Sequence, residues 1–149
     1  QEDIKMHGKI IAMIKNHDIC VLATVAGAEP HCSLMSYAVS EDGREIYMAT
    51  HKNTKKARNI SDIPDVSLLI DSREADRGES RSRVQALTIA GVMEKAALGE
   101  KSGVIRTRLL ERHPHLADFL AHPDTEFLVF RAKKYQLLEG ISAAYYEEA

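Results

Sequence analysis

Hydrophobic positions near the start of the chain recur every three or four residues, whereas farther along they gather in short runs. Met6, Ile10, Met13 and Ile14 have the helical spacing, which predicts an amphipathic helix over residues 4–16. Apolar runs of four to ten residues bounded by turn residues predict strands instead. These strands are expected over residues 19–25, 31–39, 45–50, 65–70, 84–93, 126–130 and 135–138.

Turn residues between these segments predict how the strands are connected. The segments Ala26–Pro30 and Ser40–Gly43 separate the first three strands and predict an antiparallel meander. Further helices are expected over residues 54–61, 99–112 and 116–120. Gly91, inside the longest strand, indicates a bulge or a close backbone approach. With no repeat and no linker, residues 1–149 are expected to form one mainly β domain, an antiparallel barrel with peripheral helices.

The composition and net charge favour some classes of function over others. The 149 residues are 44% hydrophobic and 28% charged, an ordinary globular balance. The net charge of −2 gives no sign of general nucleic-acid affinity. Neither a membrane-spanning run nor a signal peptide is apparent, so we expect a cytoplasmic protein. Cys20 and Cys32 lack a CxxC spacing and are expected to be reduced and buried, although a disulfide between them stays open.

The segment Ile46–Ile60 predicts a strand that runs directly into a helix. Asn53 and Thr54 are residue types that cap helix N-termini. Lys55 and Lys56 then fall in the first helical turn, where the helix dipole disfavours cations. A bound anion such as a phosphate would reverse that preference, because free N–H groups and ammonium groups together bind it. A solvated basic turn is the alternative.

Five segments in this order resemble the pyridoxamine 5′-phosphate oxidase-like family of FMN-binding split barrels. They are Val21–Pro30, Tyr47–Ala57, Val66–Ile70, Leu87–Glu94 and Leu137–Ile141. The resemblance covers residues 19–144 and implies an antiparallel split β-barrel that binds FMN. It also implies an oxidoreductase acting on a small molecule, and a homodimer with its flavin sites at the subunit interface. The substrate, the electron donor and the catalytic residues are not legible from the sequence.

The resemblance also implies which residues bind FMN. By this correspondence Lys55 and Lys56 hold the phosphate, Ala49 and Thr50 lie against the flavin, and Gln85 touches it from a later strand. The segment Ser33, Leu34, Met35 and Ser36 contacts the ring and the ribityl chain. The family often has an Arg at the start of that segment and a Lys near its end, whereas this chain has Ser33 and no Lys. Met35 and Tyr37 are either ring contacts or core residues.

Ligands other than FMN, and roles other than catalysis, are the alternatives. Some split-barrel relatives handle haem and others a deazaflavin, so a flavin- or haem-binding sensor or carrier without turnover is the alternative. The densest histidine group, His113, His115 and His122, has no cysteine or acidic partner at ligand spacing. We therefore expect exposed turn residues there and no metal site.

Two further segments carry expectations. Residues 71–82 alternate in charge and predict an exposed loop, with a lid over a ligand as the weaker reading. The segment Ala143–Ala149 ends in Glu147, Glu148 and Ala149 and contains no cation. The pyridoxamine 5′-phosphate oxidases that this chain resembles carry a longer C-terminal segment, which ends in an Arg-containing motif that helps to bind the substrate. We therefore expect that this chain does not oxidise pyridoxine 5′-phosphate efficiently.

Overall fold

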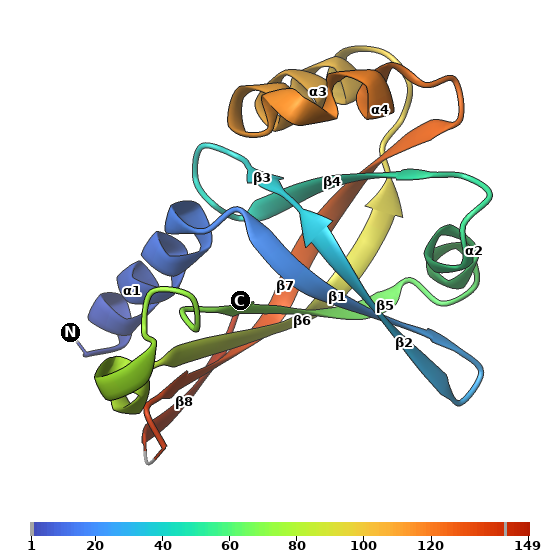
Figure 1. The fold of residues 1–149 in the computed structure, drawn as a ribbon. Coiled ribbons are helices and arrows are strands. Elements are labelled where there is room, and N and C mark those ends of the chain that lie inside the picture. The colour runs from blue at the N-terminus through green and yellow to red at the C-terminus, as the bar shows by residue number, and fades with distance from the viewer. Residues whose placement is uncertain (1, 142) are drawn as a thin grey trace.

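The computed structural model describes residues 2–141 and 143–149 and shows a curled sheet with helices at its margins (Figure 1). The helices are α1 (Glu2–Asn16), α2 (Lys55–Asp62), α3 (Glu100–Arg112) and α4 (Ala117–Ala121), with short 3₁₀ helices η1 (Gly78–Arg83) and η2 (Pro114–Leu116). The strands are β1 (Ile19–Ala26), β2 (Glu29–Ser36), β3 (Ala38–Val39), β4 (Glu45–His51), β5 (Asp65–Asp71), β6 (Gln85–Lys95), β7 (Thr125–Glu139) and β8 (Ala143–Glu148). The predicted mainly β class with antiparallel pairing and peripheral helices is confirmed.

The strand order is β2-β1-β5-β6-β7-β4-β3, with β8 paired to β7. The two strands predicted over residues 126–130 and 135–138 are one long strand, β7. Its first half pairs with β4 and its second half with β8. The residues between the two predicted segments stay in the strand because β6 pairs with Arg131, Ala132 and Lys134 from one side.

The predicted meander is confirmed in its pairings, since residues 31–36 pair with β1 and 38–39 with β4, but Tyr37 breaks the strand between them. Residues 31–39 do not form one strand: β2 ends at Ser36, and β3 begins at Ala38. Tyr37 is fully buried; its hydroxyl donates to the Ile14 carbonyl (2.7 Å) and its N–H to the Asp18 carbonyl (2.9 Å). These bonds pull the chain away from the β1–β2 hairpin, so β3 and β4 join the opposite end of the sheet.

Two apolar clusters hold the structure together. The larger one lies between α1 and the sheet and includes Ile10, Leu22 and Phe130. The smaller one joins β4 and β7 to α3 and α4 and includes Tyr47 and Leu109. Side chains alternate across a strand, so Ile46 and Met48 of β4 enter the larger cluster and Tyr47 enters the smaller one.

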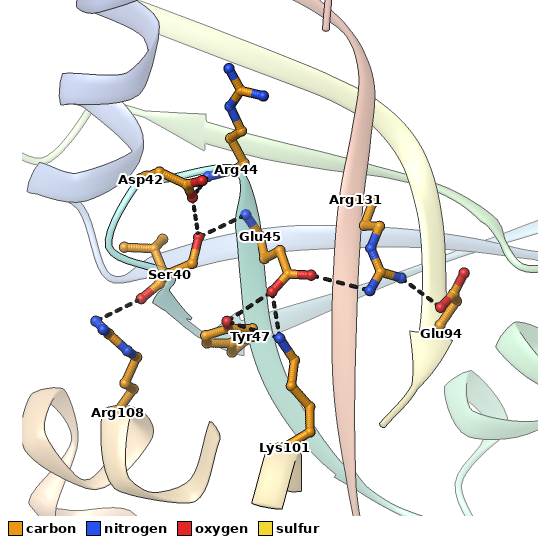
Figure 2. A network of polar contacts seen from close by, with 10 residues as sticks. Ser40, Asp42, Arg44, Glu45, Tyr47, Glu94, Lys101, Arg108 and Arg131 are labelled. Carbon is orange, nitrogen blue, oxygen red and sulfur yellow. Dashed lines mark hydrogen bonds and ion pairs between the residues drawn. The ribbon is translucent and has the colours of Figure 1, made fainter. Parts of the chain in front are cut away.

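We call residues 100–121, which contain α3, η2 and α4, the helical cap. Figure 2 shows how charged groups attach it to the sheet. One Glu45 oxygen accepts hydrogen bonds from Lys101 (2.6 Å) and from the Tyr47 hydroxyl (2.9 Å), and the other pairs with Arg131 (3.1 Å). The bond from Lys101 holds the pKa of Glu45 below its usual value. These contacts hold the α3 part of the cap over β4.

The irregularity expected at Gly91 is confirmed, and its extra residue, Lys133, lies on the partner strand β7. The register with β7 shifts between Ala90 and Gly91. A Cβ atom on Gly91 would lie 2.2 Å from the Arg131 carbonyl oxygen and 2.7 Å from the Phe130 ring. Glycine is present because the β7 backbone approaches too closely for any side chain.

The cysteines and the last strand differ from expectation. Cys20 is buried, and burial raises the pKa of its thiol to about 12. Cys32 is exposed, because position 32 of the edge strand β2 faces outward, so the prediction of two buried thiols is wrong for it. The strand β8 was not predicted, because its residues have no alternating pattern. In the described sheet it pairs with β7.

Candidate functional site

A pocket of about 240 Å³ opens where β2, β4 and α2 meet the helical cap. Its lining residues are Leu34, Met35, Ser36, Ala49, Lys56, Leu109, Leu116 and Phe119. Five of the nine residues predicted to bind FMN are therefore brought together, although they come from three separate elements.

The strands supply the apolar side of this pocket. β2 is an edge strand that pairs with β1 alone in the described sheet, so its outer main-chain groups are free to bind a ligand. Leu34 of this strand is 75% exposed at the pocket rim, whereas Met35 is largely buried. Ala49 of β4 leaves room because its side chain is a single methyl group. Such a wall suits a flat apolar ring with a polar edge.

The start of α2 supplies the polar side. Thr54 caps this helix, since its side chain accepts a hydrogen bond from the Ala57 N–H (3.3 Å). The main-chain N–H groups of Lys55 and Lys56 make no hydrogen bond within the described chain. Lys56 lines the pocket. Free N–H groups at a helix start beside an ammonium group form an anion site, and a phosphate fits it.

The two lysines are placed differently. The Lys55 ammonium lies 2.9 Å from the carboxylate of Glu29, at the start of β2. The hydrogen bond from Lys55 lowers the pKa of Glu29. Both side chains are largely exposed, so water screens this ion pair and its stabilising effect is small. Lys55 is therefore held beside the pocket and not in its lining.

Thr50 and Ser33 are next to the pocket and do not line it. Thr50 is 1% exposed, and its hydroxyl oxygen lies 3.1 Å from that of Thr54. It thus supports the capping residue of α2 from below. Ser33 pairs with Leu22 across the β1–β2 hairpin and adjoins the lining residue Leu34.

Gln85 lies far from the pocket in this chain. Ala49 pairs with Phe127 near one end of β7, and Gln85 pairs with Glu139 at the other end. The separation is roughly 40 Å along an extended strand. The Gln85 side chain donates to the Glu139 carboxylate (3.0 Å). If Gln85 contacts a ligand in this pocket, it does so from a second copy of the chain.

Sequence reasoning missed the roof of the pocket. Leu109 of α3, Leu116 of η2 and Phe119 of α4 close it from above. The Phe119 ring is stacked on the His51 ring at 4.1 Å with 9° between the planes. The periodicity of α3 put Leu109 on an apolar face, but no local signal indicates which part of the sheet that face covers.

Three other expectations concern Tyr37, the histidines and the charged loop. Tyr37 is a core residue and not a ring contact. His113 is 3% exposed, and its Nε2 lies 2.8 Å from the Tyr37 carbonyl oxygen, so the expected exposed position is wrong for it. His115 and His122 are exposed as expected. Residues 72–77 form a loop as expected, whereas residues 78–83 form η1. The Ser72 hydroxyl oxygen accepts a hydrogen bond from the Gln85 N–H, so the loop begins at the end of the sheet remote from the pocket.

The described residues contain neither a metal-binding cluster nor a membrane-spanning helix. No group of three or more His, Cys, Asp or Glu side chains there is arranged to hold a metal ion. None of the helices in residues 2–141 and 143–149 has the length and apolar character needed to cross a bilayer.

A second, larger hollow of about 620 Å³ crosses the outer face of β1, β5 and β6. Ala23, Ser67 and Ala90 are in register across these strands and form part of its floor. Lys133, Lys134, Asp65 and Glu148 stand around it with opposite charges. Such a shallow surface of mixed charge is a poorer ligand site than the pocket at α2.

Comparison with known proteins assigns the family. A model of the pyridoxamine 5′-phosphate oxidase family matches residues 6–139. The chain belongs to that family. General stress protein 26 of Bacillus subtilis (strain 168) is 37% identical to it over 70 residues, which is 47% of either chain. The match therefore spans about half the length of this curated relative.

Solved structures with the same fold differ in what they bind. A haem-binding protein from Mycobacterium smegmatis superposes with a TM-score of 0.79 and 18% identity, over 93% of this chain and 56% of that one. An FAD-binding protein from Mesorhizobium loti superposes with a TM-score of 0.75 and 15% identity, over 91% and 94%. These likenesses confirm the split-barrel fold and leave the ligand of this family member open.

Proposed function

We propose that this member of the pyridoxamine 5′-phosphate oxidase family binds FMN in the pocket at α2 and acts as an oxidoreductase on a small molecule. One observation carries the proposal: an apolar slot and a helix start with two free N–H groups meet at Lys56. FMN has the matching parts, a flat ring and a phosphate tail.

Different residues of the pocket would bind different parts of FMN. The α2 N–H groups and Lys56 would hold the phosphate, with Lys55 reaching it once it leaves Glu29. Ala49, Leu34 and Met35 would flank the ring, and the free main-chain edge of β2 would bond its polar rim. Leu116 and Phe119 would keep water away. FMN supplies the electron-transfer chemistry when it is bound.

The lining residues themselves offer no acid–base pair, because Lys56 is the one ionisable side chain among the described residues that form it. This supports a role in which a redox cofactor carries the chemistry and the protein binds and orients. It also means that the substrate needs no strong general acid or base from these walls.

We also infer that the protein is a homodimer. The pocket of about 240 Å³ is smaller than the roughly 300–1,000 Å³ of typical ligand sites, so a second copy would supply the missing wall. Leu34, exposed at the rim, is an apolar contact for it. In a twofold dimer, the copy of Gln85 able to contact this pocket would be Gln85 of the partner subunit.

A flavin- or haem-binding carrier without turnover is the second candidate. The absence of an acid–base pair from the pocket walls is equally consistent with it, and the Mycobacterium smegmatis protein binds haem. Haem would require an axial ligand, but no histidine is among the described residues that line the pocket. His51, in the stack above it, is packed against Phe119. For that reason we favour the flavin.

The deciding experiment begins with the purified protein. Its absorption spectrum and mass spectrometry of the released ligand identify what it carries, and titrations with FMN, riboflavin, FAD and haemin rank the affinities. The proposal expects FMN to bind most tightly. It fails if haemin binds with a sharp Soret band and FMN does not bind.

Turnover is tested on the FMN-loaded protein. Reduction by NADH or NADPH under anaerobic conditions, followed by repeated reoxidation with a quinone or oxygen, supports the oxidoreductase. Tight FMN binding without reduction by any donor supports the carrier.

A further inference from the structure

We propose that His51, Phe119 and His122 form a proton-sensitive clasp that holds α4 over the pocket, and that acidification releases α4. We call these three residues the histidine clasp. His51 is the last residue of β4, Phe119 lies within α4, and His122 directly follows α4.

The clasp is a set of stacked rings. The His51 ring stacks on Phe119 at 4.1 Å (9° between planes) and on His122 at 4.6 Å (25°). The His51 Nε2 lies 3.4 Å from the Phe119 carbonyl oxygen, which also accepts a hydrogen bond from the Thr125 hydroxyl (2.6 Å). α4 has only five residues. Leu120 anchors one side of it in the smaller apolar cluster, and the ring contacts hold the side that bears Phe119.

Protonation affects the two histidines differently. His51 donates to a carbonyl through Nε2, and an imidazolium can still do so. His122 accepts a hydrogen bond at Nδ1 from the Asp124 N–H (3.0 Å), which only the unprotonated nitrogen can do. A protonated His122 loses this bond. Two imidazolium rings 4.6 Å apart also repel each other.

The charged groups around the clasp do not cancel that repulsion. The charged and titratable residues on the elements that meet there are Lys52 before α2, Lys56 of α2, His115 of η2, Asp118 of α4, Asp124 before β7 and Glu126 of β7. Asp124 is paired with Lys52 (3.5 Å) and Glu126 with Lys95 (3.0 Å). Asp124 and Glu126 are thus engaged. Asp118 has no ion pair among the described residues, and Lys56, which lines the pocket together with Phe119, adds a positive charge.

Release of α4 would open the roof of the pocket, because Phe119 is part of it. The effect on ligand binding rests on the proposed function, whereas the release of α4 does not require that any ligand binds.

Hydrogen exchange of the ligand-free protein tests the clasp directly. Rates are measured for the amides of residues 117–124 at pH 7.5 and pH 5.0 and corrected for the intrinsic pH dependence of exchange. We expect protection in the wild type to fall about three- to tenfold at pH 5.0, with α3 unchanged as an internal reference.

Three variants make the test specific. His122→Phe keeps a stacking ring and His122→Gln keeps an acceptor for the Asp124 N–H, and neither titrates. At least one of them should retain α4 protection at pH 5.0. His115→Phe, which removes an exposed histidine outside the clasp, should respond as the wild type does. Equal protection of wild-type α4 at both pH values, or a wild-type response in both His122 variants, overturns the proposal.

A separate measurement distinguishes this inference from the proposed function. If FMN binds, its release rate at pH 5.0 should rise in the wild type and stay constant in the His122 variant that keeps its protection. Absence of FMN binding would refute the proposed ligand and leave the exchange result standing.

Discussion

Lys55 and Glu29 form an ion pair of 2.9 Å between the start of α2 and the β1–β2 hairpin, beside the pocket that the neighbouring Lys56 lines. The pair has a direct consequence for phosphate binding, because Glu29 competes for an ammonium group that a phosphate would use. Replacing Glu29 by Gln should therefore free Lys55 and tighten FMN binding about two- to fivefold, the range of exposed ion pairs.

Riboflavin, which lacks the phosphate, should bind the Glu29→Gln variant as it binds the wild type. Glu41→Gln is the matched control, since it removes an exposed carboxylate in the turn before β4. Fluorescence titration of the two flavins measures both effects. A gain for riboflavin as large as that for FMN would show that Glu29 acts by another route.

Replacing Lys55 and Lys56 by Ala should weaken FMN strongly and riboflavin little. Hydrogen bonds to charged groups contribute about 1.5–3 kcal/mol each, so the double variant should lose on the order of a hundredfold in affinity or more. Of the single variants, Lys56→Ala should cost more, because Lys56 already lines the pocket. Calorimetry with both flavins separates the phosphate contribution. Equal losses for FMN and riboflavin would contradict the assignment.

The protein is expected to be a homodimer in solution. Leu34→Glu should shift it toward the monomer, because a charge would be buried against the second copy, and it should weaken flavin binding in parallel. Leu98→Glu is the control, since Leu98 is 94% exposed in the loop between β6 and α3. Light scattering gives the mass. A wild-type monomer that binds flavin at full occupancy would refute the dimer.

Gly91→Ala should destabilise the fold. Its Cβ would meet the Arg131 carbonyl oxygen at 2.2 Å, and backbone cannot move aside as a side-chain tip can. We expect a loss of about 3 kcal/mol in the free energy of unfolding, the upper end of overpacking costs. Gly103→Ala is the control, because nothing lies within 4 Å of its added Cβ and alanine favours the helix by about 1 kcal/mol. Denaturant titration of both variants provides the comparison.

We expect no efficient oxidation of pyridoxine 5′-phosphate. A second phosphate, on the substrate, would need cations besides those that hold FMN, and the remaining described lining of the pocket is Ser36 and apolar side chains. Assay of the FMN-loaded protein for pyridoxal 5′-phosphate formation tests this. Turnover at rates of a dedicated oxidase would contradict it, whatever the outcome for other substrates.

Local sequence determined most of the secondary structure, because its signals are local. The spacing of Ile10 and Ile14 is enough for α1, and Thr54 before Lys55 is enough to start α2. The resemblance, carried by short motifs in order, likewise located the strand–helix junction that contributes Ala49 and Lys56 to the pocket. A glycine inside an apolar run was sufficient to indicate the bulge at Gly91.

Only the tertiary structure decided how these pieces meet. Tyr37 breaks a predicted strand because its hydroxyl finds the Ile14 carbonyl, a partner that no local pattern reveals. Glu29 and Lys55 are remote in sequence, so their ion pair, and with it the difference between Lys55 and Lys56, depends on the hairpin packing beside α2. Phe119 reaches the pocket for the same reason: strand pairing and core packing place the cap, and those contacts join residues far apart in the chain.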